Sequence, residues 1–257
     1  MEQAACWLRE ARSVTVLTGA GISAESGVPT FRAPTGRAPT GRAPTGREGV
    51  PPLWNNFRAE DLATPEAFHR DPKLVWQWYD WRRGLIAACK PNLGHFALSA
   101  LEDQKEARKL DFTLITQNVD GLHNRAGSRR ILKIHGDIWW VQCLACHKVT
   151  SDFRVPIPAL PPHCPCGGML RPAIVWFGES LPLETWNQAE TAAQSCDLFL
   201  VAGTSAVVYP AAGLAPLAQR HGARVIEINM EETPLSGAAD ISLRGHSGEI
   251  LPALIAS

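Results

Sequence analysis

The sequence predicts an α/β protein in which a doubly wound, parallel, Rossmann-like sheet carries a smaller inserted domain. Two observations predict the sheet. Short β-branched runs end in small or polar turn residues, and an apolar segment with helical spacing lies between two of these runs. A third observation predicts the insertion, because two stretches of the chain do not follow this strand and helix alternation.

The sheet is expected from four runs that read as strands. These are Val14–Thr18, Phe112–Thr116, Leu198–Val201 and Arg224–Ile228. Ala211 to Gln219, between the last two runs, has apolar residues at helical spacing. Strands that alternate with helices imply parallel βαβ units and a doubly wound sheet. We assign residues 1–31, 88–138 and 171–257 to this domain.

The inserted domain is expected at 32–87 and 139–170, and the cleft between the two domains is the expected site. Its first part contains the unit Ala-Pro-Thr-Gly-Arg three times in tandem, at 33–47, before a Trp-rich helical segment. A five-residue unit with Pro and Gly has no period that buries an apolar face. The composition therefore favours a lengthened loop over an arginine cluster that binds phosphate.

Composition limits the functions that the chain can have. Of 257 residues, 45% are hydrophobic and 19% are charged, which excludes a disordered chain, and the formal net charge is zero. No global field therefore draws the protein to nucleic acid or to an anionic membrane. The N-terminus lacks a basic start and a long apolar run. We expect a cytoplasmic protein with no nucleic-acid or membrane partner, and we favour a monomer.

The first strand leads into Gly19-Ala20-Gly21. Small residues after a first strand let backbone N–H groups approach a pyrophosphate, and the helix N-terminus that follows favours negative charge. The turn alone is weak evidence, because Ala24 stands where the Rossmann fingerprint has its third glycine.

The strand at 112–116 leads into Gln117-Asn118-Val119-Asp120, and His135-Gly136 follows. Two amides and a carboxylate in four residues suit ribose hydroxyls and a carboxamide, although Asn and Asp also close turns. A histidine before glycine is often structural. Its usual pKa of about 6.5 also suits a general base near neutral pH.

Four of the seven cysteines form two pairs, Cys143-x-x-Cys146 and Cys164-x-Cys166, and 17 residues separate Cys146 from Cys164. Clustering favours a metal over a disulfide framework. Four thiolates can close a tetrahedral structural zinc site, which makes this a zinc-binding and helical inserted domain. The second pair is one residue shorter than usual, so His147 or His163 in place of one sulfur stays an alternative.

On a helix, Tyr79 and Arg82 share one face because they are three residues apart. A hydroxyl beside a guanidinium makes a compact carboxylate receptor. Spacing alone equally describes an amphipathic helix with core aromatics and solvated arginines.

Together these motifs resemble the sirtuins, NAD-dependent enzymes that remove acyl groups from lysine side chains. The resemblance rests on the Gly19 turn and its continuation to Arg32, on 116–123 and on His135-Gly136, and it runs from about Val14 to the C-terminus. It implies an NAD-dependent protein-lysine deacylase. Its products would be nicotinamide, the free lysine and O-acyl-ADP-ribose, with one structural Zn²⁺ per chain.

The resemblance also implies residue roles. His135 would deprotonate a ribose hydroxyl, and Asn118 would share the catalytic pocket. NAD would contact the following residues: Gly19, Ala20, Gly21, Glu25, Phe31, Arg32, Gln117, Asn118, Asp120, Gly203, Thr204, Ser205, Asn229, Glu231 and Ser247. Cys143, Cys146, Cys164 and Cys166 would hold zinc.

For the acyl-lysine substrate, Tyr79 and Arg82 match sirtuins that prefer succinyl, malonyl or glutaryl lysine, and Ala63 would leave room for the longer acyl chain. Val175, Phe177, Gly178 and Glu179 would pair with the peptide backbone. Two other functions stay open. One is mono-ADP-ribosyl transfer, and the other is a zinc module that binds nucleic acid, for which the cysteine segment lacks the expected basic patch.

Overall fold

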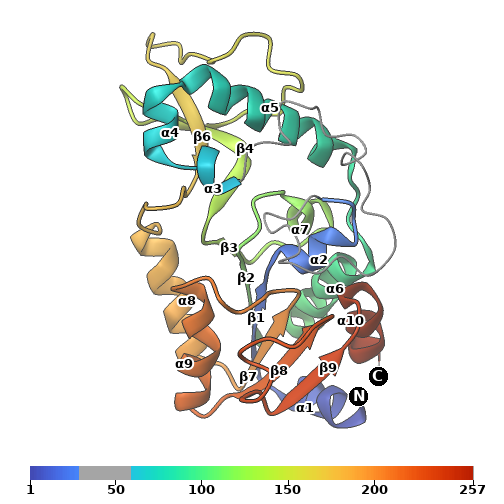
Figure 1. Cartoon of the computed structure of the whole chain (residues 1–257). Helices are drawn as coiled ribbons and strands as arrows, with labels where there is room; N and C mark the ends of the chain where they lie inside the picture. Colours follow the sequence, from blue (N-terminus) through green and yellow to red (C-terminus); the bar gives the residue numbers. More distant parts are fainter. Residues whose placement is uncertain (29–58, 257) are drawn as a thin grey trace, which may run out of the picture. The chain divides into compact units, whose positions relative to one another are not determined.

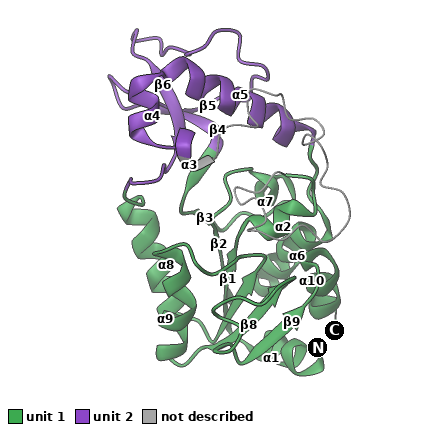
Figure 2. Ribbon diagram, viewed as in Figure 1, with its two compact units in different colours: residues 1–28, 89–137, 180–257 green, residues 29–88, 138–179 purple. Residues whose placement is uncertain are grey.

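The computed structural model describes residues 1–28 and 59–256 of the chain. The fold divides into two compact units (Figure 2). Unit 1 comprises Met1–Val28, Cys89–Asp137 and Ser180–Ser257, and unit 2 comprises Pro29–Ala88 and Ile138–Glu179. Each unit is described by itself below.

A six-stranded parallel sheet forms the centre of unit 1, in the order β3-β2-β1-β7-β8-β9 (Figure 1). The strands are β1 (Ser13–Thr18), β2 (Asp111–Thr116), β3 (Ile131–Lys133), β7 (Leu198–Ala202), β8 (Arg224–Asn229) and β9 (Ile241–Arg244). The chain order reverses between β1 and β7. In doubly wound sheets, ligands bind outside the carboxyl ends of the strands at such a reversal.

Helices cover both faces of this sheet, so its central strands are buried on both sides. One face packs against α1 (Glu2–Glu10), α6 (Leu93–Ala107) and α10 (Ser247–Ala256), and the other against α8 (Leu183–Ser195), η2 (Ala211–Gly213) and α9 (Leu214–Arg220) (Figure 1). Two short helices, α2 (Ala20–Ala24) and α7 (Leu122–Arg125), follow the carboxyl ends of β1 and β2.

Unit 2 combines helices with a three-stranded sheet in the order β5-β4-β6. Its helices are α3 (Ala59–Leu62), α4 (Pro65–Arg70) and α5 (Pro72–Ala88), and its strands are β4 (Gly136–Cys143), β5 (Val149–Ser151) and β6 (Leu170–Ile174). The Thr64 hydroxyl caps α4 by accepting the Ala67 N–H at 3.1 Å. The Trp76 indole N–H donates to the Leu170 carbonyl at 2.8 Å, which fixes α5 against β6.

The predicted fold class is confirmed. All four predicted strands are present, the predicted helix at 211–219 is η2 followed by α9, and Tyr79 and Arg82 lie on α5. The tandem repeat lies outside the described residues. None of the helices within 1–28 and 59–256 has the length and apolar character needed to cross a membrane.

Candidate active site

The turn after β1 packs tightly against the end of β7, and glycines make this packing possible. Gly203 has φ +62°, and a Cβ there would lie 2.3 Å from the Ile22 nitrogen. A Cβ on Gly21 would lie 2.7 Å from the Gly203 carbonyl oxygen, which accepts the Gly21 N–H at 2.7 Å. The Gly19 N–H donates to the Ala202 carbonyl at 3.2 Å. Gly19 and Gly21 therefore serve packing first. The Ala20 N–H has no hydrogen-bond partner within the described residues.

Gln117 joins the carboxyl ends of three strands. Its backbone N–H donates to the Thr18 carbonyl at 3.0 Å, and its side-chain amide donates to the Thr204 hydroxyl at 3.0 Å. The same hydroxyl accepts the Ala206 N–H at 3.4 Å. Gln117 and Gly203-Thr204-Ser205, predicted from separate parts of the sequence, therefore lie together at the strand reversal.

The Asn118 side chain is buried and has a fixed orientation. Its amide nitrogen donates to the Gly19 carbonyl and to the Ser23 hydroxyl, both at 3.0 Å. Both amide hydrogens are thus used inside the protein. The Oδ1 atom has no hydrogen-bond partner among residues 1–28 and 59–256, which leaves it as an acceptor for a ligand donor.

A buried network that the sequence did not predict holds Asn118 and Asp120. The Asn92 N–H donates to His95 Nδ1 at 3.3 Å, so His95 Nε2 carries a hydrogen and donates to the Ser23 hydroxyl at 3.3 Å. Ser23 in turn donates to the Asp120 carboxylate. Burial lowers the pKa of His95 to about 4 and raises that of Asp120. His95 is therefore neutral at pH 7, as this network requires.

His123 packs beside His95, with ring centroids 4.8 Å apart. Its Nε2 lies 3.0 Å from the Thr18 hydroxyl, which donates to the Thr116 hydroxyl at 2.9 Å, and Thr116 accepts the Asn118 N–H. His123 is the last residue of the segment 116–123 that carries the resemblance, but no local motif marks His95. The partners of both rings are distant in the sequence.

His135 is half-buried, and its orientation follows from one hydrogen bond. Nδ1 lies 3.0 Å from the Gln117 carbonyl oxygen, which can only accept, so Nδ1 carries the hydrogen and Nε2 carries the lone pair. Burial lowers the pKa of His135, although the Gln117 carbonyl opposes that shift. The side chain is neutral at pH 7, with Nε2 able to accept a proton.

The Glu25 side chain binds the backbone of a distant helix. Its two carboxylate oxygens accept the backbone N–H groups of Ser247 and Gly248 at 2.8 and 2.9 Å. A carboxylate at the first N–H groups of a helix is stabilising, and this contact fixes the start of α10. The predicted residues Glu25 and Ser247 are therefore joined to each other.

The loop that follows β8 contains Asn229 and Glu231. The Asn229 side-chain amide donates to the Glu231 carbonyl at 2.9 Å, and Arg244 donates to the same carbonyl at 3.2 Å. The loop backbone is therefore fixed from two sides. Phe31 and Arg32, predicted beside the nicotinamide and its ribose, lie outside the described residues.

In unit 2, Tyr79 and Arg82 are both buried on α5. The Tyr79 hydroxyl accepts the Trp176 indole N–H at 2.9 Å, and the Arg82 guanidinium lies over the Trp78 ring at 5.1 Å. Burial raises the pKa of Tyr79, while the Trp176 hydrogen bond and the charge of Arg82 oppose that rise. Tyr79 keeps its proton and can donate it to an acceptor.

The segment that follows β6 is braced on both sides within unit 2. The Phe177 N–H donates to the Ala63 carbonyl at 2.9 Å, and the Trp176 N–H donates to the Glu179 carboxylate at 2.8 Å. Arg171 forms a two-pronged ion pair with Glu179, at 2.6 and 2.9 Å. Gly178 and the Phe177 side chain are exposed. Val175 is half-buried.

The four clustered cysteines converge, with all four sulfurs within 4.8 Å of one another. The Sγ atoms of Cys143 and Cys166 are 3.5 Å apart, and those of Cys146 and Cys164 are 3.8 Å apart. A Zn–S distance of about 2.3 Å in a tetrahedron gives sulfurs about 3.8 Å apart, so the set fits zinc.

Backbone N–H groups, first that of Cys146, lower the pKa of Cys143 to about 6, which favours a thiolate ligand. The alternative with one histidine ligand is wrong, because the group of possible ligands within the described residues contains neither His147 nor His163. With four protein ligands there is no open position for water, so the site is structural.

A separate hollow of about 900 Å³ in unit 1 lies toward the amino ends of β1 and β2, lined in part by Ser13, Asp111 and Thr191. It contains none of the predicted site residues. We therefore place the candidate site at the opposite, carboxyl ends of the strands.

Comparison with known proteins agrees with this geometry. A model of the Sir2 family matches residues 19–210. An NAD-dependent protein deacylase of Aquifex aeolicus is 50% identical over 233 residues, with 90% of this chain and 89% of that protein covered. One of Ralstonia nicotianae is 45% identical over 259 residues, with 99% and 95% covered.

Solved structures are similar over the whole chain. A Sir2 homologue in complex with NAD has a TM-score of 0.87 at 42% identity, covering 100% of this chain and 93% of that one. A Sir2 variant with a deacetylated p53 peptide and 3′-O-acetyl ADP-ribose has a TM-score of 0.82 at 30% identity, covering 100% and 97%.

Proposed function

The chain belongs to the Sir2 family, and from that premise we propose that it is an NAD-dependent protein-lysine deacylase with a preference for acyl groups that end in a carboxylate. The observation that carries the enzymatic part is the arrangement at the end of β2. There, the Nδ1 atom of neutral His135 is hydrogen-bonded to the Gln117 carbonyl, which leaves Nε2 available. Gln117 directly precedes Asn118 in the sequence, and Asp120 follows two residues later.

NAD, when bound, would supply a ribose carbon that can accept the acyl oxygen as nicotinamide leaves. His135 Nε2 would accept a proton from a ribose hydroxyl. The Asn118 Oδ1 atom would accept a hydrogen bond from the nicotinamide carboxamide, and Asp120 would border the same pocket. These roles need side chains held in one orientation, which the Ser23 and His95 network supports.

The remainder of NAD would lie along the carboxyl ends of β1, β7 and β8. Ala20 and the two glycines beside it, with Gly203, Thr204 and Ser205, would face the phosphates. Asn229 and Glu231 would meet the adenosine ribose. Glu25 would act through Ser247 by fixing the start of α10 near the adenine. Phe31 and Arg32 stay predicted to close over the nicotinamide side.

The acyl preference is supported by the chemistry of α5. Arg82 offers a guanidinium fork and Tyr79 a hydroxyl hydrogen, and both lie in surroundings that exclude water. A carboxylate at the end of a succinyl, malonyl or glutaryl chain would be recognised by this pair. Ala63 would leave space for the chain, and Val175, Phe177, Gly178 and Glu179 would pair with the peptide backbone.

Kinetics on matched peptides test the proposal. The protein is incubated with NAD and one peptide sequence that carries acetyl-, succinyl-, malonyl- or glutaryl-lysine, and kcat/KM is measured for each. We expect turnover of all four, with higher values for the acidic acyl groups. Equal or higher kcat/KM on acetyl-lysine would reject the preference. ADP-ribose attached to protein without loss of acyl groups would show a mono-ADP-ribosyltransferase instead.

A further inference from the structure

Glu227 is a fully buried carboxylate in the middle of β8. Its neighbours Ile226 and Ile228 belong to the core on one face of the sheet, so Glu227 points to the other face. A buried carboxylate costs free energy unless it is paired and hydrogen-bonded. Its presence two residues before Asn229 therefore calls for a reason.

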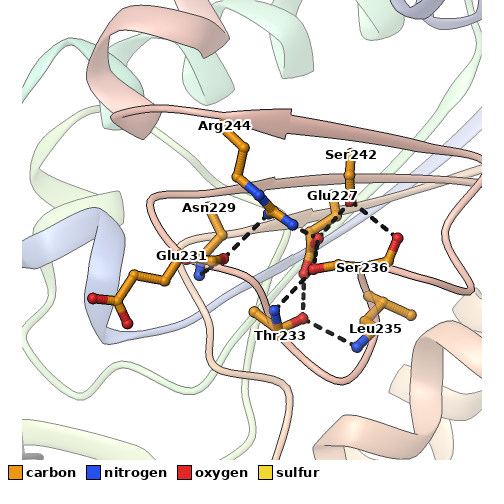
Figure 3. Close-up of polar contacts among 8 residues, drawn as sticks. All are labelled: Glu227, Asn229, Glu231, Thr233, Leu235, Ser236, Ser242 and Arg244. Atoms are coloured by element: carbon orange, nitrogen blue, oxygen red, sulfur yellow. Dashed lines mark hydrogen bonds and ion pairs between the residues drawn. The ribbon is translucent and has the colours of Figure 1, made fainter.

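Four side chains satisfy this carboxylate (Figure 3). Thr233 donates to one oxygen. Ser236 and Ser242 donate to the other at 2.6 Å each, and Arg244 donates to it at 3.2 Å. These hydrogen bonds outweigh burial and hold the pKa of Glu227 below its ordinary value. Glu227 is therefore ionised at neutral pH.

The donors also order the loop between β8 and β9. The Thr233 hydroxyl accepts the Leu235 N–H at 3.1 Å, and the Ser236 hydroxyl accepts the Thr233 N–H at 2.8 Å. Each hydroxyl thus donates to Glu227 and accepts from the loop backbone, which fixes its direction. The loop is built around the charge of Glu227.

One of these donors reaches the start of the loop. Arg244 Nη1, held by Glu227, also donates to the Glu231 carbonyl, which accepts the Asn229 side-chain amide as well. Figure 3 shows the Glu231 carboxylate pointing away from this cluster. Residues 229–231 are therefore positioned by a chain of contacts that begins at Glu227.

Fold stability alone does not explain such a cluster. Replacing a buried ionic group with well-packed apolar side chains is often neutral or stabilising, and Leu235 already packs on this face. Precise placement of a ligand-binding loop is a better reason, because a loop already held in its bound conformation loses less conformational freedom when the ligand binds and so binds it more tightly.

We propose that Glu227, through Thr233, Ser236, Ser242 and Arg244, is a positioning residue for the adenosine end of NAD. The inference rests on the proposed function, since it assumes that a nucleotide lies at the carboxyl ends of β7 and β8. Glu227 touches no substrate itself. It fixes the backbone at Asn229 and Glu231 in the geometry that the ribose requires.

Two variants test this role, and each has a matched control. Glu227→Gln removes the charge at nearly the same volume, and Thr233→Val removes one hydroxyl at the same shape. Thr233→Ser keeps that hydroxyl. Glu102→Gln is the control for a buried carboxylate elsewhere, because Glu102 accepts the Arg129 and Arg130 N–H groups at 2.9 and 3.0 Å, before the amino end of β3.

The readouts are ADP-ribose affinity by calorimetry, and KM for NAD and for the acyl peptide. Glu227→Gln should weaken ADP-ribose about 10-fold or more and raise the KM for NAD by a similar factor, as charge-assisted hydrogen bonds are lost. The KM for peptide and kcat at saturating NAD should stay within about two-fold, because the interaction serves nucleotide binding. Thr233→Val should weaken ADP-ribose about 3-fold, and Thr233→Ser less than about two-fold.

Unchanged ADP-ribose affinity in Glu227→Gln would overturn the proposal, as would equal losses in Glu102→Gln or an equal rise in the KM for peptide. If Glu227→Gln does not fold, the two Thr233 variants decide. ADP-ribose binding does not depend on deacylation. If the wild-type protein binds ADP-ribose but transfers no acyl group, the proposed function is rejected. The ADP-ribose affinities of the variants then still test the role of Glu227.

Discussion

Replacing Arg82 with methionine should remove the proposed preference for acidic acyl groups and leave deacetylation nearly unchanged. Arg82 is 6% exposed and lies on α5 one turn from the Tyr79 hydroxyl. Methionine keeps most of the apolar stem of Arg82 and removes the guanidinium, which lies over the Trp78 ring. The variant therefore tests recognition of charge with little change of shape.

The magnitude follows from the burial of this pair. Truncating one partner of a desolvated charge pair costs about 2–4 kcal/mol, which corresponds to a fall of about 30- to 900-fold in kcat/KM on succinyl-lysine. Acetyl-lysine has no carboxylate, so its kcat/KM should change by less than about three-fold. The lost cation–π contact with Trp78, about 2 kcal/mol for a desolvated pair, should appear in stability rather than in selectivity.

Tyr79→Phe should act in the same direction but more weakly, by about 2- to 13-fold for one hydrogen bond of 0.5–1.5 kcal/mol. It also leaves the buried Trp176 indole N–H without its acceptor, which should cost about 1–3 kcal/mol of folding stability. Thermal unfolding must therefore accompany the kinetics of this variant.

The assay is kcat/KM on acetyl- and succinyl-lysine versions of one peptide at saturating NAD. Arg83→Met is the matched control, because Arg83 is the next residue on α5 but pairs with Asp152 at 3.6 Å. It should lower stability and affect both peptides alike. Equal losses on both peptides in Arg82→Met would show that Arg82 does not recognise the acyl carboxylate and serves the stability of the fold instead.

The remaining predictions concern the base, the metal, pH and the repeat. His135→Ala should lower turnover about 100- to 10,000-fold and retain the affinity for ADP-ribose. In the wild type, the midpoint of the acid limb of kcat/KM should lie below pH 6.5, because burial lowers the pKa of His135. A midpoint above pH 6.5 would contradict this assignment. Cys143→Ser should release zinc, measured by metal analysis, and unfold unit 2, whereas a zinc-free, active protein would contradict a structural site. The pKa of His95 is about 4 in the folded protein, below its unfolded value, so the free energy of unfolding should fall by about 3 kcal/mol as the pH is lowered from 6.5 to 4. His95→Asn should make the free energy of unfolding, measured by denaturant titration, depend less on pH over this range. Deleting residues 38–47 should leave turnover intact, since loop closure entropy changes slowly with length; complete loss would place the repeat in the site.

The sequence predicted the sheet well because the signal is local. A buried parallel strand needs a short run of mostly apolar residues, and β1, β2, β7 and β8 each have one. The cysteine cluster was predictable for a similar reason, since ligand pairs lie close in sequence. The order of the strands and the reversal between β1 and β7 required the structure.

The residues that support the site were not predictable in the same way. Ser23 and His95 are 72 positions apart, and no local pattern joins them. Glu227 did leave a signal, a charge inside the run Val225-Ile226-Glu227-Ile228, but its partners come from the following loop and strand. Glu25 was predicted beside the cofactor, and the structure adds that its carboxylate accepts the N–H groups at the start of α10, a contact between residues at least 222 positions apart that no local pattern indicates.

The proposed function requires that this protein couples loss of an acyl group from lysine to consumption of NAD. The most direct measurement follows all products of one reaction by mass spectrometry, using an acyl-lysine peptide, NAD and the wild-type protein, with His135→Ala as the control. We predict one nicotinamide and one O-acyl-ADP-ribose for each deacylated lysine, and only a trace of these products from the variant. Release of the acyl group as a free acid without consumption of NAD would contradict the account.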